Sequence, residues 1–317
     1  MKAVFLDYAT MGPDLDLGPL RDLFADLDLY ETTPEAQLAG RIRDAAFVFT
    51  NKIRLSAELL RETRELRYIG LTATGTDNID LAAAKRHRIA VANIRAYCTE
   101  SVVEHVFGSL LMLTHSLGAY SASVRAGAWQ ASQDFCLLTF PLRELTAMTL
   151  GIVGYGDLGR GVARIGRAFG MQVLISARPG SDTAVEGRVG FEELLARSDV
   201  VSLHCPLNDQ TQDLFGADTI AKMKAGSILI NTARGALVDS AALVGALESG
   251  HLAGAAIDVL SKEPPVDGDP LLDYRGDNLI LTPHIAWATG EARQNAIDEL
   301  AANAAAFLAG QQRNRVV

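Results

Sequence analysis

The chain has 317 residues, 49% hydrophobic and 21% charged, a composition typical of a globular protein that buries a sizeable core, which excludes global disorder. The net charge of −9 argues against a basic nucleic-acid surface or a polybasic membrane anchor. No apolar run reaches the ~20 residues of a membrane helix, and Asp7 interrupts the N-terminal apolar run too early for a signal peptide. Three scattered cysteines suit neither a disulfide framework nor a zinc site. We therefore expect a cytoplasmic protein without nucleic-acid or membrane partners and without a metal site.

The first third of the chain alternates short apolar runs with helical patterns. Strands are predicted at 3–7, 46–50, 67–71 and 89–92. Helices are predicted at 19–27, 34–43, 56–64 and 78–86. Because parallel strands need a long crossover, this alternation predicts βαβ units and a parallel sheet.

A long helix is predicted at 99–116, with Thr99 as a possible cap and Glu100 in its first turn. The stretch 117–146 has little helix or strand rhythm, yet it carries large apolar side chains that are unusual in a solvated loop. These are Trp129, Phe135, Leu137, Leu138 and Phe140. We expect another surface to bury this connection, and together with the family resemblance described below it predicts a homodimer.

A second alternating series occupies the rest of the chain. Its predicted strands are 149–153, 172–176, 200–204, 227–231, 254–258 and 278–281. Its predicted helices are 158–169, 191–197, 218–223, 240–249 and an Ala-rich amphipathic segment at 292–308. Two parallel-sheet α/β domains fit this layout.

A glycine-rich turn gives the sharpest motif. Gly154, Gly156 and Gly159 follow an apolar strand and open a helix, which is the context of a dinucleotide-binding loop. The first glycine would permit the tight turn, the second the approach of a pyrophosphate, and the third close packing of helix and strand. The helix N-terminus would add free N–H groups for the phosphates. The alternative is a glycine-rich turn without a ligand.

The next predicted strand leads to Ala177 and Arg178, where NAD-specific sites usually place Asp or Glu for the ribose 2′-OH. An acid would repel a 2′-phosphate, whereas an arginine can bind one bidentately. We therefore expect NADP(H) to be favoured over NAD(H). The alternative is a solvated arginine in a turn.

Three further motifs each lie at the carboxyl end of a predicted strand, where α/β sheets bind their ligands. They contain Arg234, Glu263 and His284. Any one alone is more simply a surface cation, a loop acid or a structural histidine. Together they suit hydride transfer to a 2-keto acid. The histidine would protonate the carbonyl oxygen, the carboxylate would orient the imidazole and favour its protonated form, and the arginine would hold the substrate carboxylate.

In order along the chain, these motifs make the sequence resemble the D-isomer-specific 2-hydroxyacid dehydrogenases over nearly its whole length. The segments that carry the resemblance are 72–80, 99–105, 127–129, 151–159, 204–207 and the three motifs above. Segments 72–80 and 283–287 are most similar to the glycerate dehydrogenase/hydroxypyruvate reductase branch. The resemblance implies a flavodoxin-like substrate-binding domain of residues 1–98 and 290–317, and a Rossmann dinucleotide-binding domain of residues 99–289.

The resemblance also implies site residues. The catalytic set would be Arg234, Glu263 and His284. Cofactor contacts are expected from Gly154, Gly156, Asp157, Leu158, Gly159, Arg178, Cys205, Pro206, Thr232 and Asp258, the last at the nicotinamide amide. Substrate contacts are expected from Thr74, Gly75, Arg234 and His284, with backbone amides of the first two binding the substrate carboxylate.

One departure from the family lies at the predicted hinge. Relatives commonly read Asn-x-Pro-Gly-Tyr there, whereas this chain has Arg95 and Ala96 in place of Pro-Gly, so the identity of the substrate stays open.

The leading hypothesis is reduction of hydroxypyruvate or glyoxylate to D-glycerate or glycolate. The alternatives are a relative acting on phosphoglycerate, lactate or a bulkier acid, and a nucleotide-sensing, corepressor-like protein without catalysis.

Overall fold

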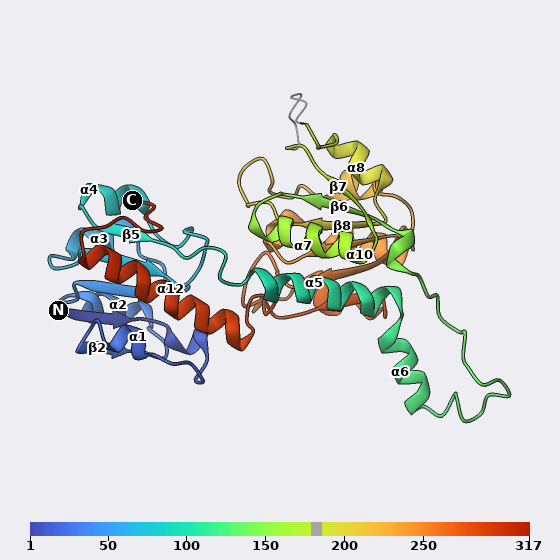
Figure 1. Cartoon of the computed structure of the whole chain (residues 1–317), viewed down its shortest axis with the longest axis horizontal. Coiled ribbons are helices and arrows are strands. Elements are labelled where there is room, and N and C mark those ends of the chain that lie inside the picture. Colours follow the sequence, from blue (N-terminus) through green and yellow to red (C-terminus); the bar gives the residue numbers. More distant parts are fainter. Residues whose placement is uncertain (179–185) are drawn as a thin grey trace. The chain divides into compact units, whose positions relative to one another are not determined.

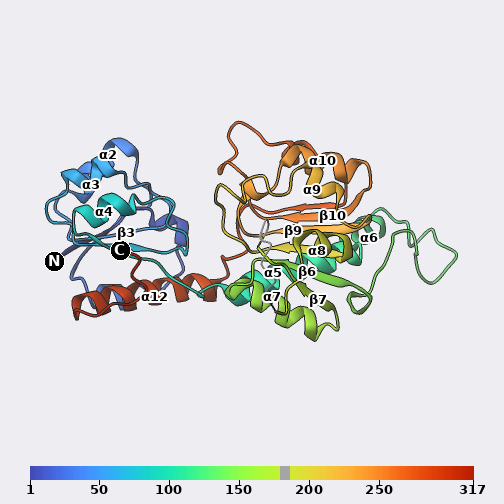
Figure 2. The ribbon, with the colours of Figure 1, turned by 90° about the horizontal axis from the view of Figure 1, so that it is seen from above.

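A computed structural model describes residues 1–178 and 186–317 and divides the chain into two compact units (Figures 1 and 2). Unit 1 comprises Met1–Cys98 and Ala288–Val317, and unit 2 comprises Thr99–Trp287. Each unit contains one parallel sheet. The expected α/β class with two parallel sheets is therefore confirmed.

Unit 1 contains a five-stranded sheet in the order β2-β1-β3-β4-β5, which is the order of flavodoxin. Its strands are β1 (Lys2–Phe5), β2 (Asp26–Leu29), β3 (Phe47–Thr50), β4 (Tyr68–Leu71) and β5 (Ala90–Ala92). Its helices before the crossing into unit 2 are η1 (Tyr8–Met11), α1 (Gly18–Arg21), α2 (Glu35–Ile42), α3 (Ala57–Glu62) and α4 (Leu81–Arg86). The buried apolar strands β1, β3 and β4 form its centre, as expected of a doubly wound sheet.

The last residues of the chain return to unit 1. The long helix α12 (Gly290–Leu308) packs on β4, where a Cβ atom at Gly70 would lie only 2.7 Å from Cδ1 of Leu300. The ring of Phe307 contacts that of Tyr68 with 4.9 Å between centroids. The tail after α12 then runs beside β5, with an antiparallel bridge between Arg315 and Ala92. Unit 1 is therefore completed only by the end of the chain.

Unit 2 contains a six-stranded parallel sheet in the order β11-β10-β9-β8-β6-β7. Its strands are β6 (Thr149–Val153), β7 (Gln172–Ile175), β8 (Val200–Leu203), β9 (Ser227–Asn231), β10 (Leu252–Ile257) and β11 (Leu279–Leu281). An isolated parallel bridge between Ser176 and Val189 stands outside β7, where the third strand of the Rossmann order would run. Unit 2 is thus a Rossmann domain in which the described residues show one bridge at the place of the third strand.

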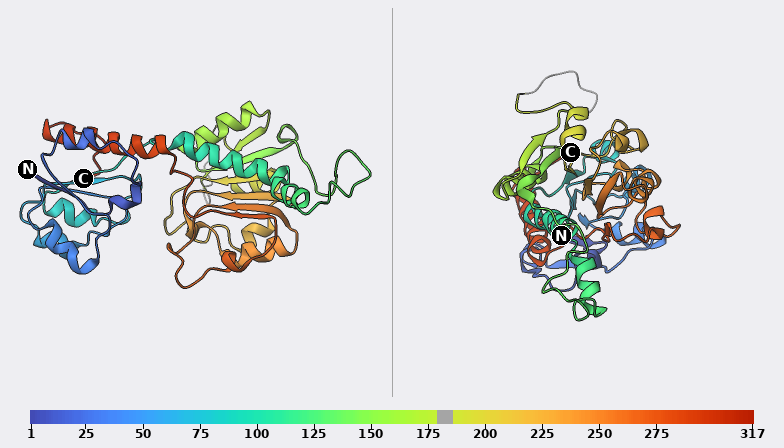
Figure 3. Two further views of the ribbon diagram at one scale, coloured as in Figure 1. Left: turned by 90° about the horizontal axis from the view of Figure 1, so that it is seen from below. Right: turned by 90° about the vertical axis from the view of Figure 1, so that its right-hand side faces the viewer.

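Helices cover both faces of this sheet (Figure 3). On one face lie α5 (Thr99–Thr114) and α7 (Asp157–Ala168). On the other lie α8 (Phe191–Arg197), α9 (Ala217–Ala221) and α10 (Ser240–Glu248), which share an apolar core with the strands. The remaining elements are α6 (Leu117–Arg125), α11 (Pro270–Asp273), η2 (Leu145–Ala147) and η3 (Gly235–Leu237).

Two element predictions were wrong. The helix expected at 19–27 ends at Arg21, and residues 26–29 form the edge strand β2, because Asp-Leu-Asp-Leu alternates with period two and pairs with β1. Residues 117–125 form α6, although no helix was expected there. This helix buries no side chain, so its apolar periodicity is weak.

The segment after α6, residues 126–144, extends away from the sheet of unit 2 (Figure 1) and is called the arm below. Its apolar side chains are exposed, with Phe135 at 90% and Leu138 at 79%. At its end, the Arg143 guanidinium binds the buried Asp199 carboxylate at 3.1 Å. The arm is therefore attached firmly to the domain at its base while its apolar surface stays uncovered.

Candidate active site

Three neighbouring strand ends carry the motifs with Arg234, Glu263 and His284. Arg234 follows β9 and precedes η3, Glu263 lies in the loop after β10, and His284 follows β11. The first two motifs are in direct contact, because a Cβ atom at Gly235 would lie 1.9 Å from the carbonyl carbon of Leu260. Only glycine permits this approach. All three motifs belong to unit 2 and end at the same edge of its sheet.

Glu263 and His284 form a close pair. Nδ1 of His284 lies 2.6 Å from Oε2 of Glu263, and the other carboxylate oxygen accepts a hydrogen bond from the Leu260 backbone N–H at 2.9 Å. The carboxylate is thereby fixed by its own loop and orients the imidazole. Within the part of the chain that is described, the opposite ring nitrogen, Nε2, has no hydrogen-bond partner, so it can exchange a proton with a bound molecule.

A cavity of about 440 Å³ adjoins this pair. Its lining includes the paired Glu263 and His284 side chains. Asp258, Thr282 and apolar residues of the same loops complete it. The lining combines an imidazole, carboxylates and apolar surface, which is the usual composition of a small-molecule site.

Asp258 supports the loop on which His284 lies. Asp258 is 2% exposed, and its carboxylate accepts hydrogen bonds from the Ile285 and Ala286 backbone N–H groups, both at 2.9 Å. The Thr282 hydroxyl donates to the same carboxylate at 2.6 Å. The contact between Asp258 and the nicotinamide amide remains a prediction, whereas this supporting role was not expected from the sequence.

His105, on α5, extends this network from behind. Its Nε2 lies 3.2 Å from the Thr282 hydroxyl and 3.9 Å from the Asp258 carboxylate. Sequence reasoning missed both His105 and Thr282. Thr282 lies two residues before His284, so the motif around His284 could have indicated it. Nothing in the sequence indicates that His105 of α5 lies close to Thr282, which follows β11.

The glycine loop has the geometry that the sequence predicts. Gly154 has φ +95°, and a Cβ atom there would lie 2.5 Å from the Cys205 backbone nitrogen. A Cβ atom at Gly159 would lie 2.1 Å from the Gly154 oxygen, so the start of α7 packs directly on the turn. At Gly156, the N-cap of α7, a Cβ atom would meet nothing within 4 Å. The backbone at the helix N-terminus thus faces open space, which fits a dinucleotide pyrophosphate.

A cavity of about 180 Å³, called the glycine-loop cavity below, lies beside this loop. Its lining unites several predicted cofactor residues, namely Gly154, Arg178, Cys205 and Pro206. It also includes Ala177, at the position of the missing acid, and Arg188, which sequence reasoning did not select.

The other predicted cofactor residues have less distinctive surroundings. The Thr232 hydroxyl is buried without a hydrogen-bond partner in the described residues, so it can serve a bound molecule. Asp157 is exposed and pairs with Arg160 at 2.5 Å within the first turn of α7. Leu158 follows it and is half-buried.

Thr74 and Gly75, the predicted substrate contacts, belong to unit 1. The Thr74 hydroxyl donates to the Ile94 carbonyl at 2.9 Å, and the Asn93 amide donates to the Thr74 carbonyl at 2.7 Å. The loop is therefore held in shape by the hinge segment that follows β5.

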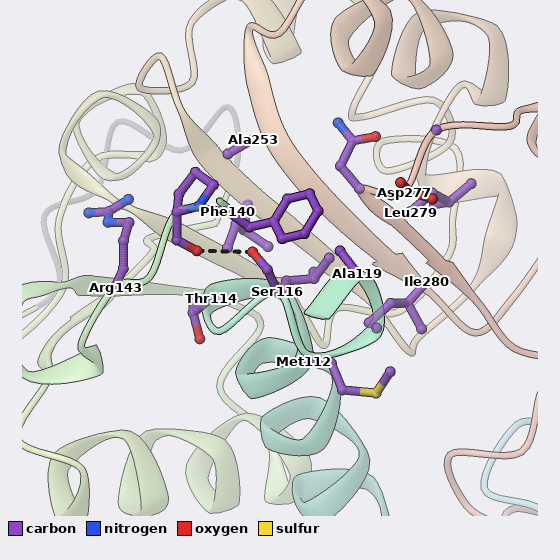
Figure 4. A pocket seen from close by; sticks show the side chains of 16 residues that line it. Met112, Thr114, Ser116, Ala119, Phe140, Arg143, Ala253, Asp277, Leu279 and Ile280 are labelled. Atoms are coloured by element: carbon purple, nitrogen blue, oxygen red, sulfur yellow. Dashed lines mark hydrogen bonds between the residues drawn. The ribbon is translucent and has the colours of Figure 1, made fainter. Parts of the chain in front are cut away.

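A further cavity of about 590 Å³ lies at the turn between α5 and α6 (Figure 4). Residues from 112–119, 140–143 and 276–280 contribute to its lining, and none of them was predicted to be a site residue. The Ser116 hydroxyl donates to the Pro141 carbonyl across it. This cavity adjoins the base of the arm, and its lining includes none of Arg234, Glu263 and His284.

Over the described ranges, no cluster of His, Cys, Asp and Glu side chains could hold a metal ion. Within the same ranges, no helix is both long and apolar enough to cross a membrane.

Comparison with known proteins decides the family. The sequence profile of the NAD-binding domain of D-isomer specific 2-hydroxyacid dehydrogenases matches residues 107–286. The chain belongs to this family. It is therefore an oxidoreductase of 2-keto and 2-hydroxy acids that uses a nicotinamide cofactor, as the resemblance implied.

Similar proteins agree with this assignment. A glycerate dehydrogenase of Methylorubrum extorquens is 44% identical over 90% of each chain. A hydroxypyruvate reductase of Blautia hydrogenotrophica is 38% identical over 100% of this chain and 99% of its own. Among solved structures, an acyclic imino acid reductase in complex with NADPH and D-Arg superposes with a TM-score of 0.87, at 28% identity and full coverage of both chains.

Proposed function

We propose that this dehydrogenase reduces a small 2-keto acid, hydroxypyruvate or glyoxylate first, to D-glycerate or glycolate. The observation that carries the proposal is the Glu263–His284 pair at 2.6 Å, beside a cavity and with the second imidazole nitrogen available. The names of the relatives at 44% and 38% identity support this substrate class.

A nicotinamide held beside the glycine loop would supply the hydride. His284 would donate the proton from Nε2 to the substrate oxygen as negative charge develops there, and would accept it in the reverse direction. Glu263 keeps the ring in the orientation that presents Nε2, through its bond to Nδ1. Arg234 would bind the substrate carboxylate with its planar guanidinium and polarise the carbonyl.

Further substrate contacts are implied by the resemblance. The backbone amides around Thr74 and Gly75 would bind the substrate carboxylate. Recognition through carboxylate binding favours an anionic 2-keto acid.

The proposal is tested by assaying purified protein with a panel of 2-keto acids and both reduced cofactors. We expect kcat/KM to be highest for hydroxypyruvate or glyoxylate. Higher kcat/KM for phosphohydroxypyruvate, pyruvate or a branched 2-keto acid would overturn the substrate assignment and leave the family intact. Cofactor binding without turnover of any acid would favour a nucleotide-sensing protein instead.

We also propose that NADP(H) is favoured over NAD(H). Ala177, 9% exposed, offers no carboxylate to a ribose 2′-OH, and Arg178 lines the glycine-loop cavity. A charge-assisted hydrogen bond contributes on the order of 1.5–3 kcal/mol, which corresponds to roughly a tenfold to hundredfold preference. Arg178→Ala should weaken NADPH use with little effect on NADH, and Ala177→Asp should reverse the preference. A wild-type preference for NADH of tenfold or more would defeat this assignment.

A homodimer is proposed from the arm. Its exposed Phe135 and Leu138 present apolar surface that a second copy could cover, and the base of the arm, at Phe140 and Pro141, lines the cavity of Figure 4. Light scattering should report about twice the chain mass of 33.9 kDa at micromolar concentration. A mass of one chain would refute the dimer.

We propose the cytoplasm as the location of this protein. All three of its cysteines are free, which suits a reducing compartment.

A further inference from the structure

Two arginines line the glycine-loop cavity, although the sequence pointed to only one. Arg178 follows the end of β7, and Arg188 comes from the segment that returns to the sheet before α8. The other polar side chains in the lining are neutral: serine, asparagine, glutamine and threonine. Its cysteine thiol is largely protonated, because burial raises the pKa of Cys205. Among the described residues, the lining thus carries two positive charges and no carboxylate.

The bridge between Ser176 and Val189 explains how Arg188 reaches this position. The Ala177 backbone N–H donates to the Val189 carbonyl at 2.8 Å, and the Val189 N–H donates to the Ile175 carbonyl at 2.9 Å. These two bonds hold the segment of Arg188 alongside the end of β7. A bond from the guanidinium Nη1 to the Ser176 carbonyl, at 3.5 Å, directs the side chain over the strand end. Backbone hydrogen bonds between described residues therefore hold the segment of Arg188 beside the end of β7.

Neither guanidinium pairs with a carboxylate among the residues that the structure describes, in contrast to Arg160 and Arg164 of the same unit. Two unpaired guanidinium groups in one cavity favour a dianionic ligand, since each can form bidentate bonds to phosphate oxygens. Beside the glycine loop, the ligand chemistry that meets this demand is a phosphate on the adenosine ribose. A ribose 2′-OH would leave both charges without a partner.

We propose that Arg188 is a second specificity-determining residue, and that Arg178 and Arg188 together bind a phosphate group on the adenosine ribose of the cofactor. This inference deepens the proposed cofactor preference and rests on it. Cofactor choice is usually interpreted from the residue at the end of the second strand of the Rossmann domain, where NAD-specific sites have an acid. The inference assigns part of the preference to Arg188, which lies outside that position.

The test uses two soluble probes that differ only in the 2′-phosphate, adenosine 2′,5′-bisphosphate and adenosine 5′-monophosphate. Calorimetric titration of the purified full-length protein gives the ratio of their dissociation constants. We expect the wild type to bind the bisphosphate at least tenfold more tightly. Arg188→Ala should reduce this ratio about tenfold, equivalent to ~1.4 kcal/mol, without changing the affinity for the monophosphate. Arg188→Lys should recover part of the ratio, because it keeps the charge and loses the planar fork.

Arg167→Ala is the matched control, because Arg167 is exposed in the last turn of α7 and lies outside the cavity lining. It removes the same charge from the same unit and should leave the ratio unchanged. Equal affinities of the wild type for both probes would overturn the inference and the proposed NADP preference together. A ratio that falls in Arg178→Ala but not in Arg188→Ala would overturn the inference alone. Because the probes undergo no reaction, absence of turnover would not affect the result.

Discussion

The backbone N–H of His284 donates to the carbonyl oxygen of Asp258 at 2.7 Å, and this bond ties the catalytic loop to the end of β10. With the two bonds to the Asp258 carboxylate, three successive amides are held by one buried residue. His284 has φ +58°, a left-handed conformation that costs a non-glycine residue roughly 1–2 kcal/mol. These bonds therefore maintain a strained backbone at the position where the imidazole must be placed.

Asp258→Asn should impair both stability and catalysis. An amide can accept only through one oxygen, so at least one buried N–H or hydroxyl loses its acceptor, which costs about 1–3 kcal/mol. We expect a lower melting temperature and a fall in kcat larger than the change in substrate KM. Asp267→Asn, at an exposed acid that pairs with Lys262, is the control. Unchanged kcat in Asp258→Asn would remove it from the positioning network.

His284 and Glu263 should differ in the size of their effect on kcat. His284→Ala removes the proton donor and should lower kcat for reduction by ~10²–10⁴. Glu263→Gln keeps a group that can hydrogen-bond Nδ1 of the ring but loses the charge that strengthens this bond, so kcat should fall by less than in His284→Ala. A kcat for Glu263→Gln equal to that of the wild type would contradict the orienting role of Glu263.

Much of this architecture could be predicted because local pattern and tertiary role coincide. The strands 149–153 and 227–231 have the expected bounds, since they are buried apolar runs between turn residues. The motifs at Glu263 and His284 could be joined because neighbouring parallel strands end at one edge of a sheet. The strand β2 was missed because its leucines also fit a helical period. Arg188 was missed because its position depends on the bridge between its neighbour Val189 and Ser176, a tertiary contact that has no local sequence pattern.

Asn93 gives a prediction about substrate binding. The buried Asn93 side-chain amide donates to the Thr74 backbone carbonyl, and the Asn93 backbone carbonyl accepts from the Asn303 side-chain amide on α12 at 2.9 Å. Asn93→Ala leaves the Thr74 loop without this support, and loss of one typical hydrogen bond of ~1 kcal/mol corresponds to about a fivefold effect. We expect substrate KM to rise by about that factor while cofactor KM stays constant. Gln37→Ala, exposed on α2 of the same unit, controls for unit 1 stability. A change confined to cofactor KM would disprove the assignment.

Ala96 gives a prediction about stability. It has φ +54° at a position where the family resemblance described above implies glycine. Replacement by glycine removes a left-handed penalty of roughly 1–2 kcal/mol, offset by the greater entropy of the unfolded chain, about 0.4–1 kcal/mol. Ala96→Gly should therefore raise the free energy of unfolding by up to about 1.6 kcal/mol in urea denaturation. Ala39→Gly, exposed within α2, should lower it by about 1 kcal/mol. Destabilisation in both variants would show that Ala96 is not strained.

His204 gives a prediction about acid sensitivity. Burial lowers its pKa from 6.5 to about 4, and its Nδ1 is buried without a partner among the described residues. As the pH falls below 6.5, the unfolded chain binds a proton that the folded chain does not. Stability is therefore lost by up to ~1.4 kcal/mol per pH unit down to about pH 4.

The measurement compares the free energy of unfolding at pH 7 and pH 5 in the wild type and in His204→Asn. The wild type should lose about 2 kcal/mol more than the variant over this interval. His87→Asn, at an exposed histidine, should lose as much as the wild type. Equal losses in the wild type and His204→Asn would show that His204 does not drive the acid sensitivity.

The return of α12 to unit 1 has a consequence during protein synthesis. The ribosome completes the strands of unit 1 early, but the face that carries Phe47 and Tyr68 receives Phe307 only after all of unit 2 has been made. At ~5–20 residues per second, this aromatic face waits uncovered for roughly 10–50 s. Nascent chains should therefore depend on chaperones that bind exposed apolar surface. Joining the 288–317 segment ahead of Met1 in a circular permutant should shorten that dependence.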